Sequence, residues 1–294
     1  MNRFTVFLAL AILLLSCEKT IHLELETVPP KIVVEGTIEN GGHPLVILTR
    51  SQAYFARITP QQLAASFVHG ATVTIATGAR VDTLKEYAVP LAPGFSLSYY
   101  TSDSARLASA ITGQLQTSYA LRIESEGSVY TATTTIPGYH KRLDSIWYQP
   151  VTGDTSGRQV LVYVRAADAP GFGDYVRYWT KRNREPYLPG FTSVYDDLVI
   201  DGTTYNLAVE PGIDRNSDDN SFASRAFKKG DTVTLKLSGI DKATYDFWRT
   251  MEYTYASIGN PFSTPVRVLS NVSGGALGYF GGYASQYRSI IIPR

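Results

Sequence analysis

The sequence predicts a mainly β protein made of two β-rich domains, and three observations lead to this prediction. Short runs rich in Val, Ile, Thr and Tyr alternate with polar residues along most of the 294-residue chain, as in half-buried strands. Gly, Pro, Asn and Asp separate these runs at regular spacing. One segment, Asp241–Ser257, carries a helical repeat instead. The hydrophobic content of 44% and the charged content of 18% are typical of a folded chain.

The chain begins with the features of an export signal. Arg3 precedes an apolar run of about a dozen residues, Phe4–Leu15, which is as long as the hydrophobic part of a signal peptide and too short to span a bilayer. Ser16 and then Cys17 follow directly, an arrangement that looks like a bacterial lipobox. We therefore expect residues 1–16 to be a lipoprotein signal peptide and Cys17 to carry the lipid, palmitate among its acyl chains.

The segment that follows is expected to be a lipidated tether over residues 17–30, because its alternating pattern stops at two consecutive prolines. Cys17 is the only cysteine, so internal disulfides are excluded although the signal implies export. No other apolar run approaches the length of a membrane span, which leaves the lipid as the expected anchor.

The charge balance of the mature chain gives no reason to expect nucleic acid as a partner. Lys and Arg number 27 and Asp and Glu number 26 in the whole chain, and Arg3 is the only charged residue before Cys17. The mature chain is therefore formally neutral, and it contains no run of five or six basic residues.

The first domain is expected over residues 31–137 as a β-sandwich of the immunoglobulin or transthyretin type. About seven short strands within roughly a hundred residues are typical of that architecture. An antibody-type domain would also need a cysteine pair, which is absent. The predicted strands are 32–38, 44–49, 71–76, 80–87, 95–100, 119–124 and 128–135.

The second domain is expected over residues 138–294 and is also β-rich. The best local turn signal is Asp201-Gly202, which lies between strand-forming residues and predicts a tight hairpin over 198–205. The last part of the chain, from Ala276 to Tyr283, is rich in Gly and aromatic residues. The other predicted strands are 143–148, 160–165, 174–182, 231–237 and 289–292.

A single long helix is predicted over Asp241–Ser257. Asp241 can cap its first turn, and the side chains of Tyr245, Trp248, Glu252 and Tyr255 fall on one stripe at helical spacing. The Gly-Asn-Pro sequence that begins at residue 259 ends the helix.

The motifs that enzymes need are not found, so we expect a protein without catalytic residues. The four His residues are scattered, whereas a zinc protease needs two of them four residues apart on a helix. The nearest match to a hydrolase elbow, Gly153–Gly157, has Thr in place of the central Ser and is better explained as a hairpin turn. No phosphate-binding or dinucleotide-binding fingerprint is present.

Two acidic segments leave alternatives open. Asp196 and Asp197, together with Asp201, have the residue types for acid–base catalysis, but adjacent Asp residues near a turn are more typical of turn formation. The segment Asp214–Asn220 has the Asp-x-Asn-x-Asp spacing of a calcium loop, yet it lacks the expected Gly at its sixth position and an acid at its twelfth. We favour turns in both places and expect no metal or cofactor.

The many aromatic residues favour a binding function over a catalytic one. The chain has 20 Tyr, 12 Phe and 3 Trp, and such side chains either stack on sugar or peptide ligands or fill the half-buried faces of strands. For any single residue, packing is favoured. The groups considered are Tyr99-Tyr100, Trp147-Tyr148, Tyr175, Tyr178-Trp179 and Tyr279-Phe280 with Tyr283.

Several motifs along the mature chain carry a family resemblance. They are Cys17-Glu18-Lys19-x-Ile21-x-Leu23-x-Leu25, Pro30–Gly36, Asp174–Tyr178, Asp196–Gly202, Asn260-Pro261-Phe262-Ser263-x-Pro265, Ser270-Asn271-Val272 and Gly275-x-Leu277–Tyr283. This pattern resembles a family of uncharacterised Bacteroidota outer-membrane lipoproteins known only as a domain of unknown function. The closing Gly-Tyr-Phe-Gly-Gly-Tyr group is its most specific part. The resemblance supplies no catalytic residue.

Members of that family are commonly encoded beside TonB-dependent receptors, so the resemblance implies an accessory role in uptake. The leading hypothesis is a lipid-anchored, non-enzymatic outer-membrane protein that partners such a receptor, with a peptide or glycan as a possible ligand. Both the periplasmic and the cell-surface leaflet of the outer membrane remain as alternatives for the anchor. The alternatives are a structural or adhesive envelope lipoprotein and an unrecognised hydrolase acting on surface glycans or peptides.

Overall fold

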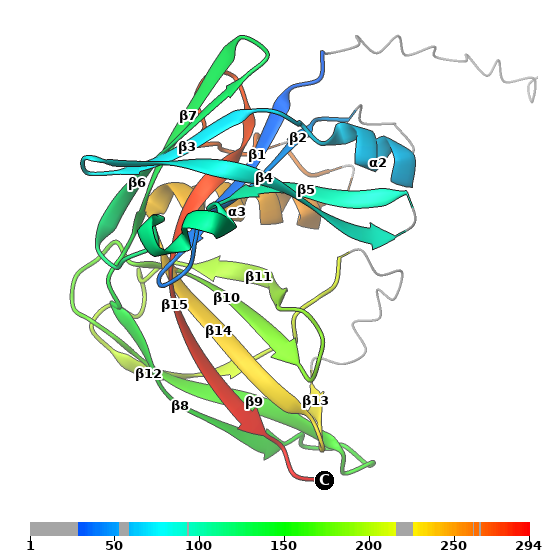
Figure 1. The fold of residues 1–294 in the computed structure, drawn as a ribbon. Helices are drawn as coiled ribbons and strands as arrows, with labels where there is room; N and C mark the ends of the chain where they lie inside the picture. The colour runs from blue at the N-terminus through cyan, green and yellow to red at the C-terminus, as the bar shows by residue number, and fades with distance from the viewer. Residues whose placement is uncertain (1–28, 53–58, 93, 216–225, 261, 265) are drawn as a thin grey trace, which may run out of the picture.

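The computed structural model describes residues 29–294 except 53–58, 93, 216–225, 261 and 265. It confirms a mainly β protein with few helices. Within the described residues the strands form one eleven-stranded sheet, in the order β11-β10-β14-β15-β1-β2-β5-β4-β3-β6-β7, and one four-stranded sheet. Figure 1 shows the strands of residues 32–136 in the upper half of the molecule and the smaller sheet in the lower half.

The upper half has a sandwich-like layout, because the large sheet curls until β7, at one of its ends, faces β15 and β1 across one core. Its strands follow the predicted runs, and β4 continues past them to Ala92, where it still pairs with β5. The strands are β1 (Ile32–Glu39), β2 (Leu45–Arg50), β3 (Thr72–Thr77), β4 (Arg80–Ala92), β5 (Phe95–Thr101), β6 (Thr117–Ser125) and β7 (Ser128–Ile136). Helix α2 (Pro60–Ser66) and a 3-10 turn (Ser104–Ser109) complete it.

Strict alternation builds the core of this half. In β1, Ile32, Val34 and Ile38 point into the core, and the residues between them point to the opposite face. Leu121 and Ile123 of β6 meet them from the other side of the sandwich. Two predominantly hydrophobic inner faces therefore close on each other, and the outer face of β1 is left to contact the rest of the chain.

The lower half contains a second core between two layers. The four-stranded sheet consists of β8 (Lys141–Pro150), β9 (Gln159–Asp168), β12 (Thr204–Val209) and β13 (Phe227–Lys228). It packs on strands of the large sheet, namely β10 (Tyr175–Arg182), β14 (Thr232–Ile240) and β15 (Leu277–Ile291). The strand at the edge of the large sheet, β11 (Leu188–Tyr195), packs against the helix described below. Val160, Val162 and Phe227 face Val233 and Leu235 between the layers.

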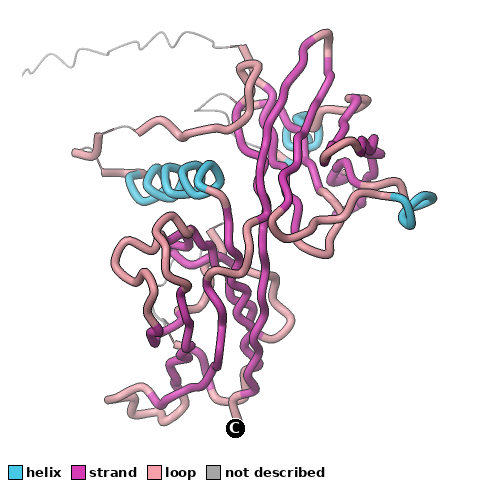
Figure 2. The backbone as a smooth tube through the Cα atoms, turned by 90° about the vertical axis from the view of Figure 1, so that its left-hand side faces the viewer, coloured by secondary structure: helices cyan, strands magenta, loops and turns pink. Residues whose placement is uncertain are grey.

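The predicted helix is confirmed as α3 (Lys242–Ser257). The carboxylate of Asp241 accepts a hydrogen bond from the N–H of Thr244, which is the N-cap expected from the sequence. Tyr245 and Glu252 of the predicted stripe are buried, whereas Tyr255 is exposed. Figure 2 shows the helix lying beside the strands at the level where the two halves meet.

The last strand belongs to both halves. Residues Val33–Glu39 of β1 pair in parallel with Leu277–Tyr283, and the rest of β15 pairs antiparallel with β14. Figure 1 shows this strand running the length of the molecule. Val272, Ala276, Phe280 and Ala284 consequently fill the core of the upper half, although they lie far beyond the boundary predicted at residue 137.

The hairpin predicted over 198–205 is wrong. Residues 198–202 form a turn, in which the N–H groups of Ile200 and Asp201 both donate to the carbonyl of Asp197. The strand that follows, β12, pairs with β9 and not with the residues before the turn. The apolar side chains that suggested a strand are exposed, and Val199 retains 93% of its accessible surface.

Candidate functional site

A hollow at the junction of the two halves gathers charged and aromatic side chains from four strands, the helix α3 and the residue that precedes β11. We call it the central hollow. Its volume is about 290 Å³, enough for a ligand the size of one sugar or amino-acid residue, since a water molecule takes about 30 Å³. It is lined by Glu35, Thr37, Glu39, Arg177, Trp179, Tyr187, Pro189, Lys236, Trp248, Tyr279 and Tyr283.

Sheet register explains why these side chains meet. Glu35 and Glu39 alternate with the core residues of β1 and therefore project from its outer face. Across the parallel pair, Glu35 lies opposite Tyr279 and Glu39 lies opposite Tyr283. Two strands away, Trp179 of β10 pairs with Lys236 of β14 on the same face.

Arg177 is held rigidly at one side of the central hollow. It is only 4% exposed, and the carbon at the centre of its guanidinium lies 3.3 Å from the ring centre of Trp248 and 4.7 Å from that of Trp179. Its Nε donates to the hydroxyl of Ser193 at 3.1 Å, and Ser193 in turn donates to the buried carboxylate of Glu252. No other described residue accepts a hydrogen bond from this guanidinium, so its Nη groups are available to a ligand.

Glu35 also presents an unpartnered polar group to the central hollow. Its carboxylate forms no hydrogen bond or ion pair with any described residue. Solvent reaches the side chain, but the walls of the hollow surround it, and this burial raises the pKa of Glu35 despite the opposing charge of Arg177. An unpaired carboxylate and an unpaired guanidinium edge therefore share one hollow.

The floor of the central hollow is a hydrogen-bonded aromatic cluster. The indole N–H of Trp248 donates to the hydroxyl of Tyr283 at 3.2 Å, and that hydroxyl donates to Tyr279 at 3.1 Å. Burial raises the pKa of Tyr279 well above its usual value, so the phenol stays neutral. Phe247 stacks on Tyr279 from the helix, with ring centres 4.5 Å apart. These contacts fix the shape of the site before any ligand arrives.

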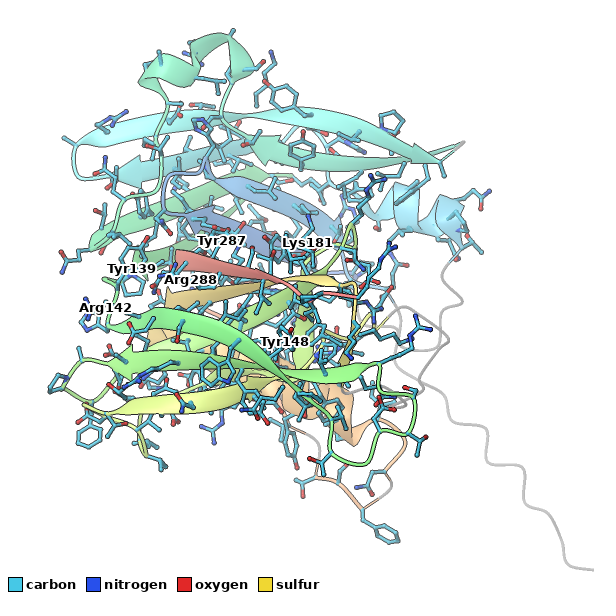
Figure 3. All side chains as sticks on the ribbon, turned by 90° about the horizontal axis from the view of Figure 1, so that it is seen from below. Tyr139, Arg142, Tyr148, Lys181, Tyr287 and Arg288 are labelled. Atoms are coloured by element: carbon cyan, nitrogen blue, oxygen red, sulfur yellow. The ribbon has the colours of Figure 1, made fainter. Side chains whose placement is uncertain are left out.

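The rim of the central hollow is closed by a charged network. Glu39 pairs with Lys236 and accepts a hydrogen bond from the hydroxyl of Tyr287. Lys236 also lies 5.0 Å from the ring centre of Trp179. Figure 3 shows Tyr287 and Arg288 on β15, with Lys181 of β10 close to the same end of the sheet.

The three Asp residues weighed for acid–base catalysis do not act together. Asp196 accepts a hydrogen bond from the hydroxyl of Tyr245, whereas Asp197 and Asp201 join Asp168 in what we call the carboxylate cluster. Asp197 accepts from the N–H groups of Gly173 and Asp174. Burial raises the pKa of Asp197, but these hydrogen bonds and the charge of Lys141 outweigh it and lower the pKa overall.

The nearest match to a hydrolase elbow is a turn, as expected. The carboxylate of Asp154 accepts hydrogen bonds from the N–H groups of Gln159, Ser156 and Arg158, and these bonds lower its pKa to about 2. The segment connects β8 to β9, so Asp154 has a structural part in the hairpin.

Other predicted site residues lie partly or wholly outside the described residues. Cys17 is among them, as are all of Asp214–Asn220 except Asp214 and Arg215. In the described part of the chain, no helix is both long and apolar enough to cross a membrane.

Most of the aromatic residues that were considered as ligand-stacking platforms pack inside the protein instead, which is the alternative that the sequence favoured. Tyr100 and Phe280 lie in the upper core, and Trp147 stacks on Tyr163 of the neighbouring strand with ring centres 5.8 Å apart. Trp179, Tyr279 and Tyr283 line the central hollow, so these three aromatic residues also contribute to the candidate site.

Sequence reasoning missed Glu35 and Arg177. A signal for Glu35 was present, because a lone acidic residue interrupts the apolar run of β1 and alternation places it opposite the core. Arg177 offered no such signal. Its hydrogen-bond partner Ser193 lies 16 residues away and Trp248 lies on the distant helix α3, so only the fold brings these side chains together.

One family model matches most of the chain. It covers residues 18–289 and is described as a domain of unknown function, DUF4249. No curated protein matches the chain. The matched range contains β1, β10, β11, β14, α3 and the first thirteen residues of β15, and thus every element that lines the central hollow. The chain therefore belongs to the DUF4249 family of domains of unknown function.

Proposed function

We propose that this protein is a non-enzymatic binding protein of the bacterial outer membrane, anchored by a lipid on Cys17, that captures a small ligand in the central hollow. The observation that carries the proposal is that the carboxylate of Glu35 and the Nη groups of Arg177 have no hydrogen-bond partner among the described residues and share one preformed hollow. A fixed guanidinium offers donors to a ligand, and the carboxylate accepts from it.

The chemistry of the hollow favours a ligand with closely spaced donors and acceptors. A sugar hydroxyl or a peptide end group can accept from Arg177 and donate to Glu35 at once. The indole of Trp248 is already covered by the guanidinium, so recognition by free ring stacking is weaker here than recognition by polar groups. These features support a glycan or peptide ligand.

The expected lipid anchor and the family resemblance support a role beside a transporter. Membrane residence through several acyl chains would hold the central hollow close to the outer membrane. We propose that a TonB-dependent receptor is the partner that takes up the captured ligand.

Binding measurements on the full-length chain in detergent test the capture step. We expect a panel of glycans and peptides to contain ligands that bind, and Glu35→Gln or Arg177→Lys to weaken their binding by about tenfold or more, because each loses a charge-assisted hydrogen bond. Glu124→Gln is the matched control, since the side chain of Glu124 is exposed on the outer face of β6 and pairs with Arg122. Equal affinity in all variants would contradict the hollow as the binding site.

Affinity purification from solubilised membranes tests the partner. We expect a tagged protein to recover an outer-membrane receptor, and recovery without any barrel partner would argue against the transporter role. Turnover of a bound glycan or peptide would contradict a non-enzymatic function.

A further inference from the structure

The carboxylate cluster lies where two loops meet, away from the central hollow. One oxygen from each of Asp168, Asp197 and Asp201 can be chosen so that all three lie within 4.8 Å of one another. That spacing fits a single cation, because calcium–oxygen distances of about 2.4 Å place ligand atoms at most twice that far apart. Asp168 at the end of β9 supplies one oxygen and the turn at 197–202 supplies the other two, so the fold brings the cluster together from two separate segments.

An unsatisfied buried oxygen points to a missing ligand. The side chain of Asp168 is 0% exposed. Its Oδ1 accepts from the ammonium of Lys141 at 2.6 Å, but its Oδ2 is buried without a hydrogen-bond partner. Leaving a buried carboxylate oxygen without a partner is costly, and a bound cation would remove that cost.

The local charge balance favours a cation as the ligand. Asp174 lies near Asp168 and Asp197 and adds a fourth carboxylate to the region. Lys141 is buried beside Asp168 and supplies one positive charge, while His140 lies at the edge, 3.3 Å from Asp174. A single ammonium leaves most of this negative charge uncompensated.

We propose that the carboxylate cluster binds a divalent cation, with Ca²⁺ as the best match. All three candidate ligands are carboxylates, and oxygen-only sites prefer hard cations. Asp201 is only half-buried, which gives the ion a path from solvent. Lys141 stays on Oδ1 of Asp168, and the ion takes the side of Oδ2.

The bound ion would fix two loops that carry exposed apolar residues. Asp201 accepts from the N–H of Gly171 and Asp197 accepts from the N–H of Gly173, so the cluster ties residues 171–173 to the turn at 197–202. Phe172, Leu198 and Val199 project from these segments into solvent. Neutralising the carboxylates would hold these loops in one arrangement.

Calcium titration of the full-length chain, purified in detergent and stripped with a chelator, tests this proposal. We expect Ca²⁺ to release or absorb heat at a stoichiometry of one and to raise the melting temperature, and Tb³⁺ to show sensitised luminescence that Ca²⁺ displaces. No heat, no shift and no luminescence in the wild-type chain would overturn the proposal.

Two variants locate the site. Asp201→Asn keeps an oxygen that can accept from Gly171 but removes a charge, so we expect at least a tenfold loss of Ca²⁺ affinity. Asp154→Asn is the matched control, because Asp154 also accepts backbone hydrogen bonds in a loop and lies outside the cluster. Equal weakening by both variants would overturn the assignment.

If Asp201→Asn does not fold, amide hydrogen exchange on the wild-type chain locates the bound ion without a variant. We expect Ca²⁺ to slow the exchange of the amides of residues 171–174 and 197–203 relative to the rest of the protein. Protection elsewhere, without a change in these loops, would place the ion at another site.

Discussion

Glu86 shows how one carboxylate can organise a surface of this protein. Burial alone would raise its pKa, but hydrogen bonds from the N–H of Gly70, the hydroxyl of Ser98, the ring of His69 and the hydroxyl of Tyr100 lower it to about 2. These donors come from the segment before β3 and from β5, so the carboxylate ties the two together. Its charged form is the one that the fold stabilises.

The sign of this shift predicts a loss of stability in acid. The folded pKa of Glu86 is about 2 and the unfolded pKa is about 4.3, so its contribution is fully present above pH 5 and disappears as the pH falls towards 2. We expect Glu86→Gln to lower the free energy of unfolding by on the order of 2 kcal/mol at pH 7, and by about half as much at pH 3. Urea denaturation at both pH values measures this, and a loss that does not depend on pH would contradict it.

At the scale of elements, Asp241 both begins α3 and attaches it to the upper half. One carboxylate oxygen caps the helix through Thr244, and the other accepts from the hydroxyl of Thr134 and the N–H of Thr135 in β7. A cap recognised from the sequence therefore also joins two elements that are more than a hundred residues apart.

We expect Asp241→Ala to destabilise the protein by about 2–4 kcal/mol, because it removes a helix cap and leaves partners in β7 unsatisfied. Lys242→Ala is the control, since its pair with Asp246 is exposed and worth less than about 1 kcal/mol. Thermal denaturation followed by circular dichroism compares them. A loss of less than 1 kcal/mol for Asp241→Ala would show that the bonds to β7 contribute little.

A glycine marks where β15 passes close to β7. A Cβ atom on Gly282 would lie 2.9 Å from the backbone of Thr135 and Ile136. We expect Gly282→Ala to destabilise the protein by about 1–3 kcal/mol through overpacking. Ala284→Gly is the control for a change in the same strand, because it adds no atom. Equal melting temperatures for wild type and Gly282→Ala would contradict the close approach.

Local sequence signals were enough to predict most helices and strands. The pairing of strands far apart in the sequence, and the site that this pairing creates, could not be predicted from them. The helix over 241–257 was predictable because cap, stripe and stop all lie within its own sequence. The hairpin at Asp201-Gly202 failed because the preceding Asp197 uses its carboxylate to bind the loop at Gly173. The central hollow was not predictable, since its polar pair comes from β1 and β10, which become neighbours only through β14 and β15.

At the scale of the molecule, β15 makes the two halves depend on each other. Phe280 is wholly buried in the upper core, and β14 pairs with the same strand in the lower half. We expect a single cooperative unfolding transition, with fluorescence and circular dichroism giving the same midpoint, and Phe280→Ala to lower the free energy of unfolding by about 3–5 kcal/mol. Two separate transitions would contradict this coupling.

The same strand predicts the behaviour of a fragment. We expect residues 29–137 alone to lack a cooperative transition, because β1 loses its parallel partner and the core loses Val272, Ala276 and Phe280. Circular dichroism during thermal denaturation of the fragment and of the whole chain checks this. A fragment that melts cooperatively would show that the first domain is independent.

The parallel pairing of β1 with β15 also has a consequence for biosynthesis. A ribosome completes β1 at residue 39 but cannot supply its partner until residue 277 has been added. The upper half therefore keeps one sheet edge open throughout translation, and its native sheet can form only when the polypeptide is nearly finished. A premature stop codon as late as position 276 would therefore leave the first strand without its parallel neighbour.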